Sequence, residues 1–283
     1  MIVYKETNRT GRRYPVNPMP KQIELNEGRR LFGLNPQGYE DARPEYPIWI
    51  FDRLRERGAL VDGTPTLEIG AGTGKATRRL LEYGARPLTI VEPDTRFATM
   101  LGALTKSSPH IPVIHESFEE VVLAENQFHL ITAATAFHWI EPNAGLLKIK
   151  RLLKANGFVA LFWNVLSDAD KEDLFHNATQ SVLSPLAMNP LEKPDSVPFA
   201  LDREARQAGA KAAGFQNTEY FESRWSVVMS TDEIGKLYES FSHIQRLDAD
   251  SRAKVLNELR DIADRQFGGK VVRNITTSLY LFT

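Results

Sequence analysis

The fold of this chain is restricted most by an alternation of short apolar runs and amphipathic segments between residues 66 and 163. The apolar runs predict five strands, at residues 66–69, 88–92, 113–116, 129–134 and 158–163. The segments between them predict helices at residues 75–83, 95–104 and 142–153. Apolar strands joined by helices form a parallel sheet that is covered on both faces, so the chain is predicted to be an α/β protein.

The regions that flank this alternation have a different character. Residues 1–33 are rich in Arg, Asn and Pro and predict a solvated N-terminal tail, with a basic docking arm as the alternative. Residues 34–283 are predicted to form one domain, with inserts at about 166–202 and 230–269 that serve as helical lids or substrate-binding elements. The alternating run 271–282 predicts a final antiparallel strand.

Composition excludes several classes of function. Lys and Arg number 35 against 36 Asp and Glu, so no net field favours nucleic acid. No apolar run approaches the roughly 18 residues that span a bilayer, and the N-terminus lacks a secretory apolar core, so we expect neither membrane association nor export. Cysteine is absent and the six histidines show no metal-ligand spacing, so we expect no metal and a cytoplasmic location.

A glycine-rich turn joins the first predicted strand to the first helix of the alternation. Gly70, Gly72 and Gly74 stand at alternate positions, whereas a dinucleotide fold places its third glycine where this chain has Lys75. Glu68, at the end of the strand, would oppose a pyrophosphate but suits a ligand with an ammonium and a sulfonium. The turn therefore favours S-adenosylmethionine over a nicotinamide cofactor, which remains the alternative.

An acidic residue closes the second predicted strand. Glu92 follows the glycine turn by about 20 residues, the distance at which nucleoside-binding folds place a carboxylate for the ribose hydroxyls. Both kinds of cofactor use this acid, so Glu92 predicts nucleoside binding without choosing between them. The alternative is that Glu92 only stabilises the start of the helix at residue 95.

Five segments together resemble a known family. They are YEDARPEYP (39–47), LEIGAGTGKAT (67–77), IVEPD (90–94), SFEE (117–120) and ATAFHWIEP (134–142). In this order they resemble the class I S-adenosylmethionine-dependent methyltransferases of type 11, especially the small-molecule branch similar to trans-aconitate methyltransferase. The resemblance covers most of the chain from Leu34 onward. It implies a Rossmann-like three-layer αβα sandwich with a seven-stranded, mostly parallel sheet of order 3-2-1-4-5-7-6 and an antiparallel strand 7.

The resemblance also implies which residues hold the cofactor. Glu68 and the glycine turn would hold the methionine end, Glu92 the ribose, and Ser117 with Phe118 the adenine. Many relatives carry Asp where this chain has Ser117, so the hydrogen bond to adenine would lack charge assistance here. The full set of expected cofactor residues is Arg43, Glu68, Gly70, Ala71, Gly72, Gly74, Glu92, Pro93, Ser117, Phe118, Ala134 and Phe137.

The acceptor is expected beyond the end of the fourth strand, because ligands in open α/β sheets bind at the carboxyl ends of the strands. Tyr39, His138 and Trp139 are the candidates on this side. His138 could act as a general base or could only position the acceptor, and a carboxylate acceptor would need no base. Arg43 could pair with the methionine carboxylate or with an anionic acceptor, or lie on the surface. Trp163 and Asn164 are weaker candidates for the wall of the pocket.

The sequence thus predicts an enzyme that moves a methyl group by in-line displacement to a small-molecule acceptor at a carboxylate or hydroxyl oxygen, leaving S-adenosylhomocysteine. Two alternatives remain open. One is a protein or catalyst that binds S-adenosylmethionine without transferring its methyl group, and the other is a nicotinamide-dependent oxidoreductase. The acceptor and the oligomeric state are beyond the sequence.

Overall fold

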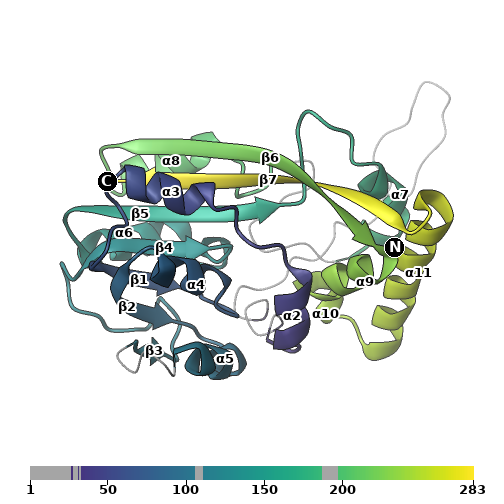
Figure 1. Cartoon of the computed structure of the whole chain (residues 1–283), viewed down its shortest axis with the longest axis horizontal. Coiled ribbons are helices and arrows are strands. Elements are labelled where there is room, and N and C mark those ends of the chain that lie inside the picture. The colour runs from purple at the N-terminus through teal and green to yellow at the C-terminus, as the bar shows by residue number, and fades with distance from the viewer. Residues whose placement is uncertain (1–26, 28–30, 32, 106–110, 187–196) are drawn as a thin grey trace, which may run out of the picture.

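A computed structural model describes residues 27, 31, 33–105, 111–186 and 197–283 of the chain. The predicted tail at residues 1–33 lies almost entirely outside this part. In Figure 1 an extended sheet leads from the layered body of the molecule to a group of helices at its other end. Among the described residues, no helix combines the length and the apolar character needed to cross a membrane.

The sheet has seven strands in the order β3-β2-β1-β4-β5-β7-β6. They are β1 (Thr64–Ile69), β2 (Ala85–Val91), β3 (Val113–Ile114), β4 (Phe128–Ala134), β5 (Leu153–Val165), β6 (Thr218–Ser230) and β7 (Lys270–Phe282). The first five pair in parallel, and β7 is antiparallel to both of its neighbours. This confirms the predicted sheet order and the antiparallel seventh strand.

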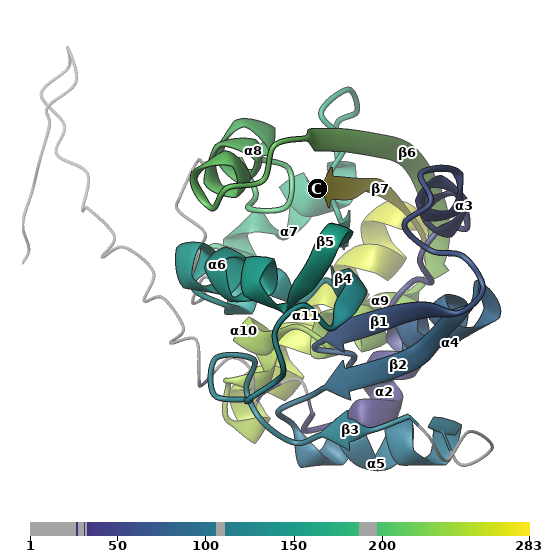
Figure 2. The ribbon, with the colours of Figure 1, turned by 90° about the vertical axis from the view of Figure 1, so that its left-hand side faces the viewer.

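Helices cover both faces of the sheet, as Figure 2 shows. On one face α3 (Trp49–Glu56), α4 (Lys75–Glu82) and α5 (Thr95–Thr105) contribute apolar side chains to one buried cluster with the strands. On the other face α6 (Pro142–Leu152) and α8 (Arg203–Ala212) contribute to a second cluster. The three layers that the resemblance implied are therefore present.

A third buried cluster lies apart from the layered body. It joins α7 (Leu174–Leu183), α9 (Thr231–Glu239), α10 (Ser242–Gln245) and α11 (Ala249–Phe267) with the adjoining ends of β6 and β7. Ser230 and Glu233 form the capping box that begins α9, because each side chain accepts a hydrogen bond from the other residue's backbone N–H. The described parts of both predicted inserts thus contain helices, while residues 187–196 lie outside the described chain.

Two local features differ from the sequence prediction. Strand β3 has two residues instead of the four predicted, because His115 and Glu116 are exposed beyond its pairing with β2. A short helix, α2 (Pro36–Ala42), precedes the body and was not predicted. Asn35 caps it by accepting a hydrogen bond from the backbone N–H of Gly38, but only Ala42 is buried, so α2 lacks the apolar periodicity that reveals a helix.

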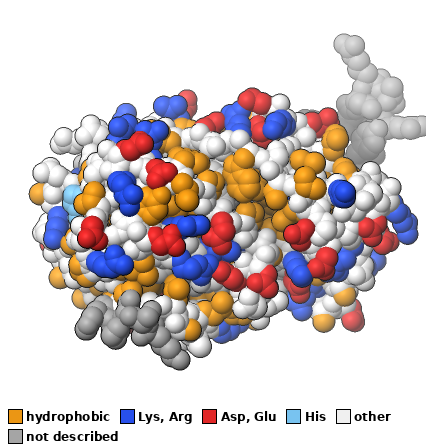
Figure 3. All heavy atoms as spheres, viewed as in Figure 1, with side chains coloured by type: hydrophobic (Ala, Val, Ile, Leu, Met, Phe, Trp, Pro, Cys, Tyr) orange, Lys and Arg blue, Asp and Glu red, His pale blue; other side chains and the backbone are white. Residues whose placement is uncertain are grey.

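The surface reflects the near balance of charge. On the face drawn in Figure 3, basic and acidic side chains are interspersed, and no large area of that face carries one sign alone. Apolar side chains are also visible between them, as is normal for a folded protein.

Candidate functional site

A cavity of about 340 Å³ opens where β1, β2, β4 and β5 end. Helix α2 and residues of the two inserts, at about 166–202 and 230–269, line its sides. This is the position at which open α/β sheets bind ligands, and the volume lies in the range of small-molecule sites. The cavity is lined by residues of widely separated segments: Tyr39, Arg43, Pro44, Tyr46, Ile69, Gly70, Ala71, Gly72, Thr73, Lys75, Ala76, Val91, Glu92, Pro93, Phe97, Phe118, Glu119, Ala134, Thr135, Ala136, His138, Trp139, Ile140, Trp163, Asn164, Val165, Leu166, Pro198, Phe199, Ala200, Leu237, Phe241, Ser242 and Ile275.

The glycine turn between β1 and α4 forms one wall of this cavity. Gly70 has φ of 67°, and a Cβ atom there would lie 2.6 Å from the Cβ of Ala136, so a side chain is excluded twice over. Gly72, with φ of 56°, has no heavy atom within 4 Å of the position that its Cβ would take. The backbone at Gly72 is therefore open to close approach by a ligand.

Glu92 lies beside this turn. Its carboxylate accepts hydrogen bonds from the backbone N–H of Gly72 at 2.8 Å and of Asp94 at 3.0 Å, one on each oxygen. Each oxygen keeps a second lone pair, so two neighbouring hydroxyls could bind to the same carboxylate. Burial raises the pKa of Glu92 to about 7, although both backbone hydrogen bonds favour the ionised form.

Glu68 is placed differently from the expectation that it holds the methionine end. It is fully buried and does not line the cavity; one of its oxygens accepts a hydrogen bond from the hydroxyl of Thr77 at 2.7 Å. The other oxygen has no hydrogen-bond partner among the described residues, and burial raises the pKa of Glu68 to about 7. Glu68 thus joins β1 to α4 beneath the turn.

Of the two residues expected at the adenine, one lines the cavity and the other does not. Phe118 lines the cavity and is 3% exposed. Ser117 does not line it; its hydroxyl donates to a carboxylate oxygen of Glu120 at 2.8 Å and accepts from the backbone N–H of Glu120. Adenine could therefore contact the ring of Phe118, while the hydroxyl of Ser117 already has partners.

Helix α2 brings Tyr39 and Arg43 to the cavity from the N-terminal side. The ring of Tyr39 meets that of Phe97 edge-on at 5.8 Å. Arg43 donates from Nε to the hydroxyl of Ser240 at 2.8 Å, and its guanidinium stacks 4.2 Å from the centre of the Phe241 ring. Arg43 is thus held against the insert and is not a surface residue, and burial lowers its pKa.

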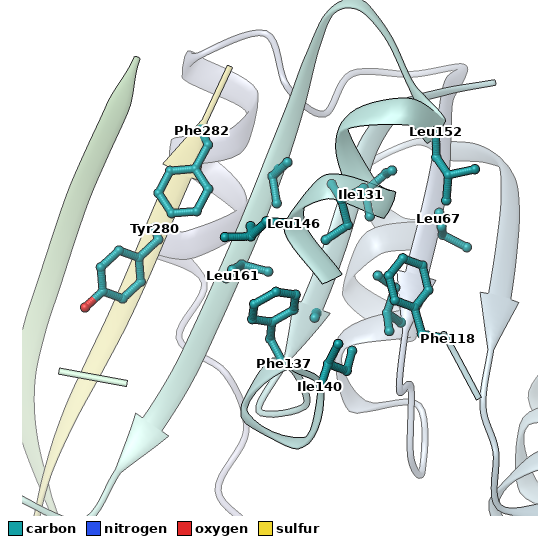
Figure 4. Close-up of a cluster of buried hydrophobic side chains, with 14 of the residues drawn as sticks. Leu67, Phe118, Ile131, Phe137, Ile140, Leu146, Leu152, Leu161, Tyr280 and Phe282 are labelled. Carbon is teal, nitrogen blue, oxygen red and sulfur yellow. The ribbon is translucent and has the colours of Figure 1, made fainter. Parts of the chain in front are cut away.

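The chain turns sharply after β4. Thr135 has φ of 51°, a strained value for a β-branched residue, and the hydroxyl of Tyr46 donates to Thr135 Oγ1 at 2.8 Å. Ala134 lines the cavity. Phe137 does not, because it points into the buried cluster beneath α6, as Figure 4 shows.

His138 lies in the short 3₁₀ helix η1 (Phe137–Trp139) that follows this turn. Its Nδ1 accepts a hydrogen bond from the indole N–H of Trp163 at 3.1 Å, and its Nε2 has no partner among the described residues. Burial, together with the charge of Arg43, lowers the pKa of His138 to about 3. The ring is therefore a neutral imidazole at ordinary pH.

The structure brings most of the expected site residues together. Those that line the cavity are Tyr39, Arg43, Gly70, Ala71, Gly72, Glu92, Pro93, Phe118, Ala134, His138 and Trp139; the weaker candidates Trp163 and Asn164 line it as well. Glu68, Gly74, Ser117 and Phe137 lie outside its wall. No group of three or more potential metal ligands occurs in the described part of the chain.

Several lining residues escaped the sequence analysis. They include Phe97, Thr135, Phe199 and Phe241, and Tyr46 lines the cavity as well. Tyr46 stands in a segment that the resemblance had already marked, but Phe199 and Phe241 stand in the inserts, where no local pattern distinguishes a wall residue from a core residue. Their positions follow only from tertiary packing.

The cavity fits a nucleoside cofactor without phosphates. An ionisable acid with free lone pairs lies next to an open glycine backbone. The one lysine in the described lining, Lys75, pairs with Glu45 at 2.8 Å and Glu40 at 3.7 Å, so it is not free for a phosphate. Fold and site together define an α/β protein whose cavity suits an uncharged or cationic nucleoside.

Sequence comparisons narrow this class. Residues 67–161 match the methyltransferase domain family. The uncharacterised methyltransferase-like protein C25B8.10 of Schizosaccharomyces pombe is 29% identical over 245 residues, which cover 87% of this chain and 89% of that protein. The uncharacterised methyltransferase Rv3342 of Mycobacterium tuberculosis is 34% identical over 133 residues, or 47% of this chain and 51% of that protein.

Solved structures share the fold at low identity. The [4+2]-cyclase SpnF has a TM-score of 0.57 at 14% identity, with 95% of this chain and 99% of that chain covered. Phosphoethanolamine N-methyltransferase 2 of Haemonchus contortus, solved with phosphomonomethylethanolamine and S-adenosylhomocysteine, has a TM-score of 0.53 at 15% identity, with 96% of this chain and 61% of that chain covered. The family match, the relatives and the shared fold together support a class I S-adenosylmethionine-dependent methyltransferase.

Proposed function

We propose that this methyltransferase esterifies a carboxylate of a small-molecule acceptor. The proposal is supported first by the shape of the site. The cavity of about 340 Å³ lies between the sheet, α2 and the segments that supply Phe199 and Phe241. Such a site suits a small acceptor better than a nucleic acid or a protein surface.

The observation that carries the choice of acceptor group is the hydrogen bond between Trp163 and His138. An indole N–H can only donate, so His138 Nδ1 must accept, and the proton of the neutral ring is then on Nε2. A general base needs a free lone pair facing the acceptor, and Nε2–H presents a donor instead. Among carboxylate, hydroxyl and amine acceptors, only the carboxylate is already in its nucleophilic form at neutral pH.

The residues of this chain then have positioning roles. The backbone at Gly72 and the carboxylate of Glu92 would hold the nucleoside, and Phe118 the adenine. His138 Nε2–H would hold one oxygen of the acceptor carboxylate, and the surrounding rings exclude water that would otherwise solvate it. When bound, S-adenosylmethionine supplies a methyl group on a sulfonium, and its transfer to a carboxylate gives a neutral ester and S-adenosylhomocysteine without any proton being moved.

The experiment is a transfer assay with methyl-labelled S-adenosylmethionine and an extract of small molecules, followed by mild treatment with hydroxide. We expect the label in products that release methanol, because esters hydrolyse under these conditions and methyl ethers and methylamines do not. Label that survives hydroxide would refute the carboxylate. Stabilisation of the protein by S-adenosylhomocysteine but not by a nicotinamide dinucleotide serves as the control for the cofactor.

The pH dependence of the rate provides a second test. With a carboxylate acceptor and no base, the rate at saturating concentrations of both substrates should be flat between about pH 5.5 and 8. A rise in that range with the slope of one ionisation would mean that a base removes a proton from the acceptor, which would count against a carboxylate.

A further inference from the structure

The half of the cavity beyond Thr135 is walled mainly by aromatic rings. Trp163 meets Phe199 at a ring-centre distance of 5.9 Å, and the ring of His138 lies 5.2 Å from that of Trp139 and 6.4 Å from that of Phe199. We call this half the acceptor chamber. Its other described walls are the ring of Phe241 and the side chains of Val165, Leu166, Leu237 and Ile275.

The rings come from segments far apart in the chain. His138 and Trp139 follow β4, Trp163 is near the end of β5, Phe199 precedes α8, and Phe241 lies between α9 and α10. Pairs of aromatic rings at centre distances between 4.5 and 7 Å are favourable, so this chamber offers edges and faces to a further flat group. Aliphatic side chains supply much of the remaining surface, and the polar residues Asn164 and Ser242 also line the cavity. The amide of Asn164 already donates to the carbonyl oxygen of Glu45 and accepts from the hydroxyl of Thr277.

Charge is scarce in the acceptor chamber. The described lining of the whole cavity contains four charged side chains, Arg43, Lys75, Glu92 and Glu119. Lys75 is paired with Glu45, Glu92 lies at the glycine turn, and Glu119 adjoins Phe118 on the nucleoside side. Arg43 is the cation that remains.

Arg43 has no acidic partner among the described residues. Nε donates to the hydroxyl of Ser240, Nη2 donates to the carbonyl oxygen of Ser240 at 3.2 Å, and the guanidinium lies over the rings of Phe241 and Tyr39. These contacts orient the group but leave its charge uncompensated. One anionic group of a bound ligand can compensate it.

From the rings and this single cation, and resting on the proposed function, we infer that the acceptor is a monocarboxylic acid with a flat, apolar body, such as an arylalkenoic acid. A polycarboxylate would place two or more further anions among rings and aliphatic side chains, where no described cation is left to pair with them. If Arg43 pairs with the methionine carboxylate instead, His138 Nε2–H is the donor left for the acceptor. The chamber can then still hold only one carboxylate of the acceptor.

The test compares three acids of different shape and charge on the protein loaded with S-adenosylhomocysteine: 3-phenylpropenoate, hexanoate and propene-1,2,3-tricarboxylate. Binding is measured by calorimetry, and ester formation is measured separately with methyl-labelled S-adenosylmethionine. We expect the aromatic acid to bind at least tenfold more tightly than the tricarboxylate and about threefold more tightly than hexanoate. Tighter binding of the tricarboxylate, or binding of none of the three, would overturn the inference.

The two proposals fail in different ways. Esterification of the tricarboxylate alone would agree with carboxylate methylation but would refute the inference that the acceptor is a flat monocarboxylic acid. A label that resists hydroxide, on an amine or hydroxyl of a compound from an extract, would refute carboxylate methylation itself.

Variants locate the effect in the acceptor chamber. Phe199→Leu and Phe241→Leu should each reduce the preference for 3-phenylpropenoate over hexanoate about threefold, and Phe199→Leu should leave the affinity for S-adenosylhomocysteine the same. Phe267→Leu is the matched control, because Phe267 packs against Phe175 in the helical insert and does not line the cavity. Two variants are needed because Phe199 is 8% exposed and its replacement could disturb folding. An unchanged preference in both would place the acceptor elsewhere.

Discussion

The nucleoside side of the cavity and the acceptor chamber are built on different principles. On the side proposed to hold the nucleoside, the polar groups are backbone atoms and one carboxylate, and Glu92 and Gly72 belong to consecutive βα units. In the acceptor chamber the working groups are side chains from five separate segments. A constant ligand can be held by backbone in a short stretch of sequence, whereas a variable ligand is held by side chains that only the tertiary fold assembles.

The largest effect is expected at Glu92. Glu92→Ala should weaken binding of S-adenosylhomocysteine by about 100-fold, because a buried acceptor for two hydroxyls is lost. Calorimetry measures this directly. An unchanged affinity would show that the ribose binds elsewhere and would remove the distinction between the two sides.

The pKa of Glu92 gives the same residue a pH signature. Since burial raises this pKa to about 7, the carboxyl is largely protonated at pH 6 in the ligand-free protein and ionised at pH 8. Hydroxyl donors bind the ionised form better, so the affinity for S-adenosylhomocysteine should rise with pH through 7. Glu92→Gln should be weak and independent of pH in this range; a pH dependence that persists in this variant would have another source.

A smaller effect, about tenfold on kcat, is expected for Trp163→Phe. The variant frees His138 Nδ1, so the imidazole can adopt either tautomer and no longer holds Nε2–H toward the acceptor. Trp225→Phe is the matched control, because the indole of Trp225 donates to Thr277 Oγ1 at 2.8 Å and does not line the cavity. Equal losses in both variants would indicate a general effect of removing an indole.

The turn after β4 should show an effect of about 1 kcal/mol, or fivefold, on the affinity for S-adenosylhomocysteine. Tyr46→Phe removes the hydroxyl that holds Thr135 at positive φ. In a Thr135→Gly background the same change should have almost no effect, because glycine adopts this conformation freely. Additive effects of the two changes would mean that Tyr46 acts independently of the strained turn.

The smallest effect is expected at Ser117. Its hydroxyl is already bonded to Glu120, so Ser117→Ala should change the affinity for S-adenosylhomocysteine less than twofold. Phe118→Ala should reduce it about tenfold through lost contact with the adenine. A large loss at Ser117 would restore the adenine role that relatives with Asp suggest.

The same division explains what could be predicted from the sequence. The glycine turn and Glu92 were found because their spacing is local and fixed by the βα unit. Glu68 was correctly placed at the end of β1, but successive strand residues point to opposite faces of a sheet. Leu67 and Ile69 belong to the cluster beneath α6, and Glu68 therefore points the other way, toward Thr77 of α4.

The acceptor chamber offered no such regularity. At its border, Tyr46 and Thr135 are 89 residues apart in sequence, and neither carries a pattern that marks the contact. Phe199 and Phe241 lie in segments of mixed polarity. Phe199 belongs to the cluster beneath α6, and Phe241 packs against the third cluster. His138 was identified, but the position of its proton depended on the hydrogen bond from Trp163, which the sequence marked only as a weaker candidate for the pocket wall.

The ladder between β6 and β7 ends with the pair Ser230 and Lys270, and the whole helical stretch 231–269 lies between these two paired residues. Its two ends are thus already held side by side by the sheet, so exchanging the stretch for one of another length changes the entropy of loop closure only slightly. The stretch 231–269 contains Leu237 and Phe241, which line the acceptor chamber. Exchanging residues 231–269 for the matching segment of a related protein would transfer part of the acceptor specificity. The strands proposed to bind the nucleoside would keep their register.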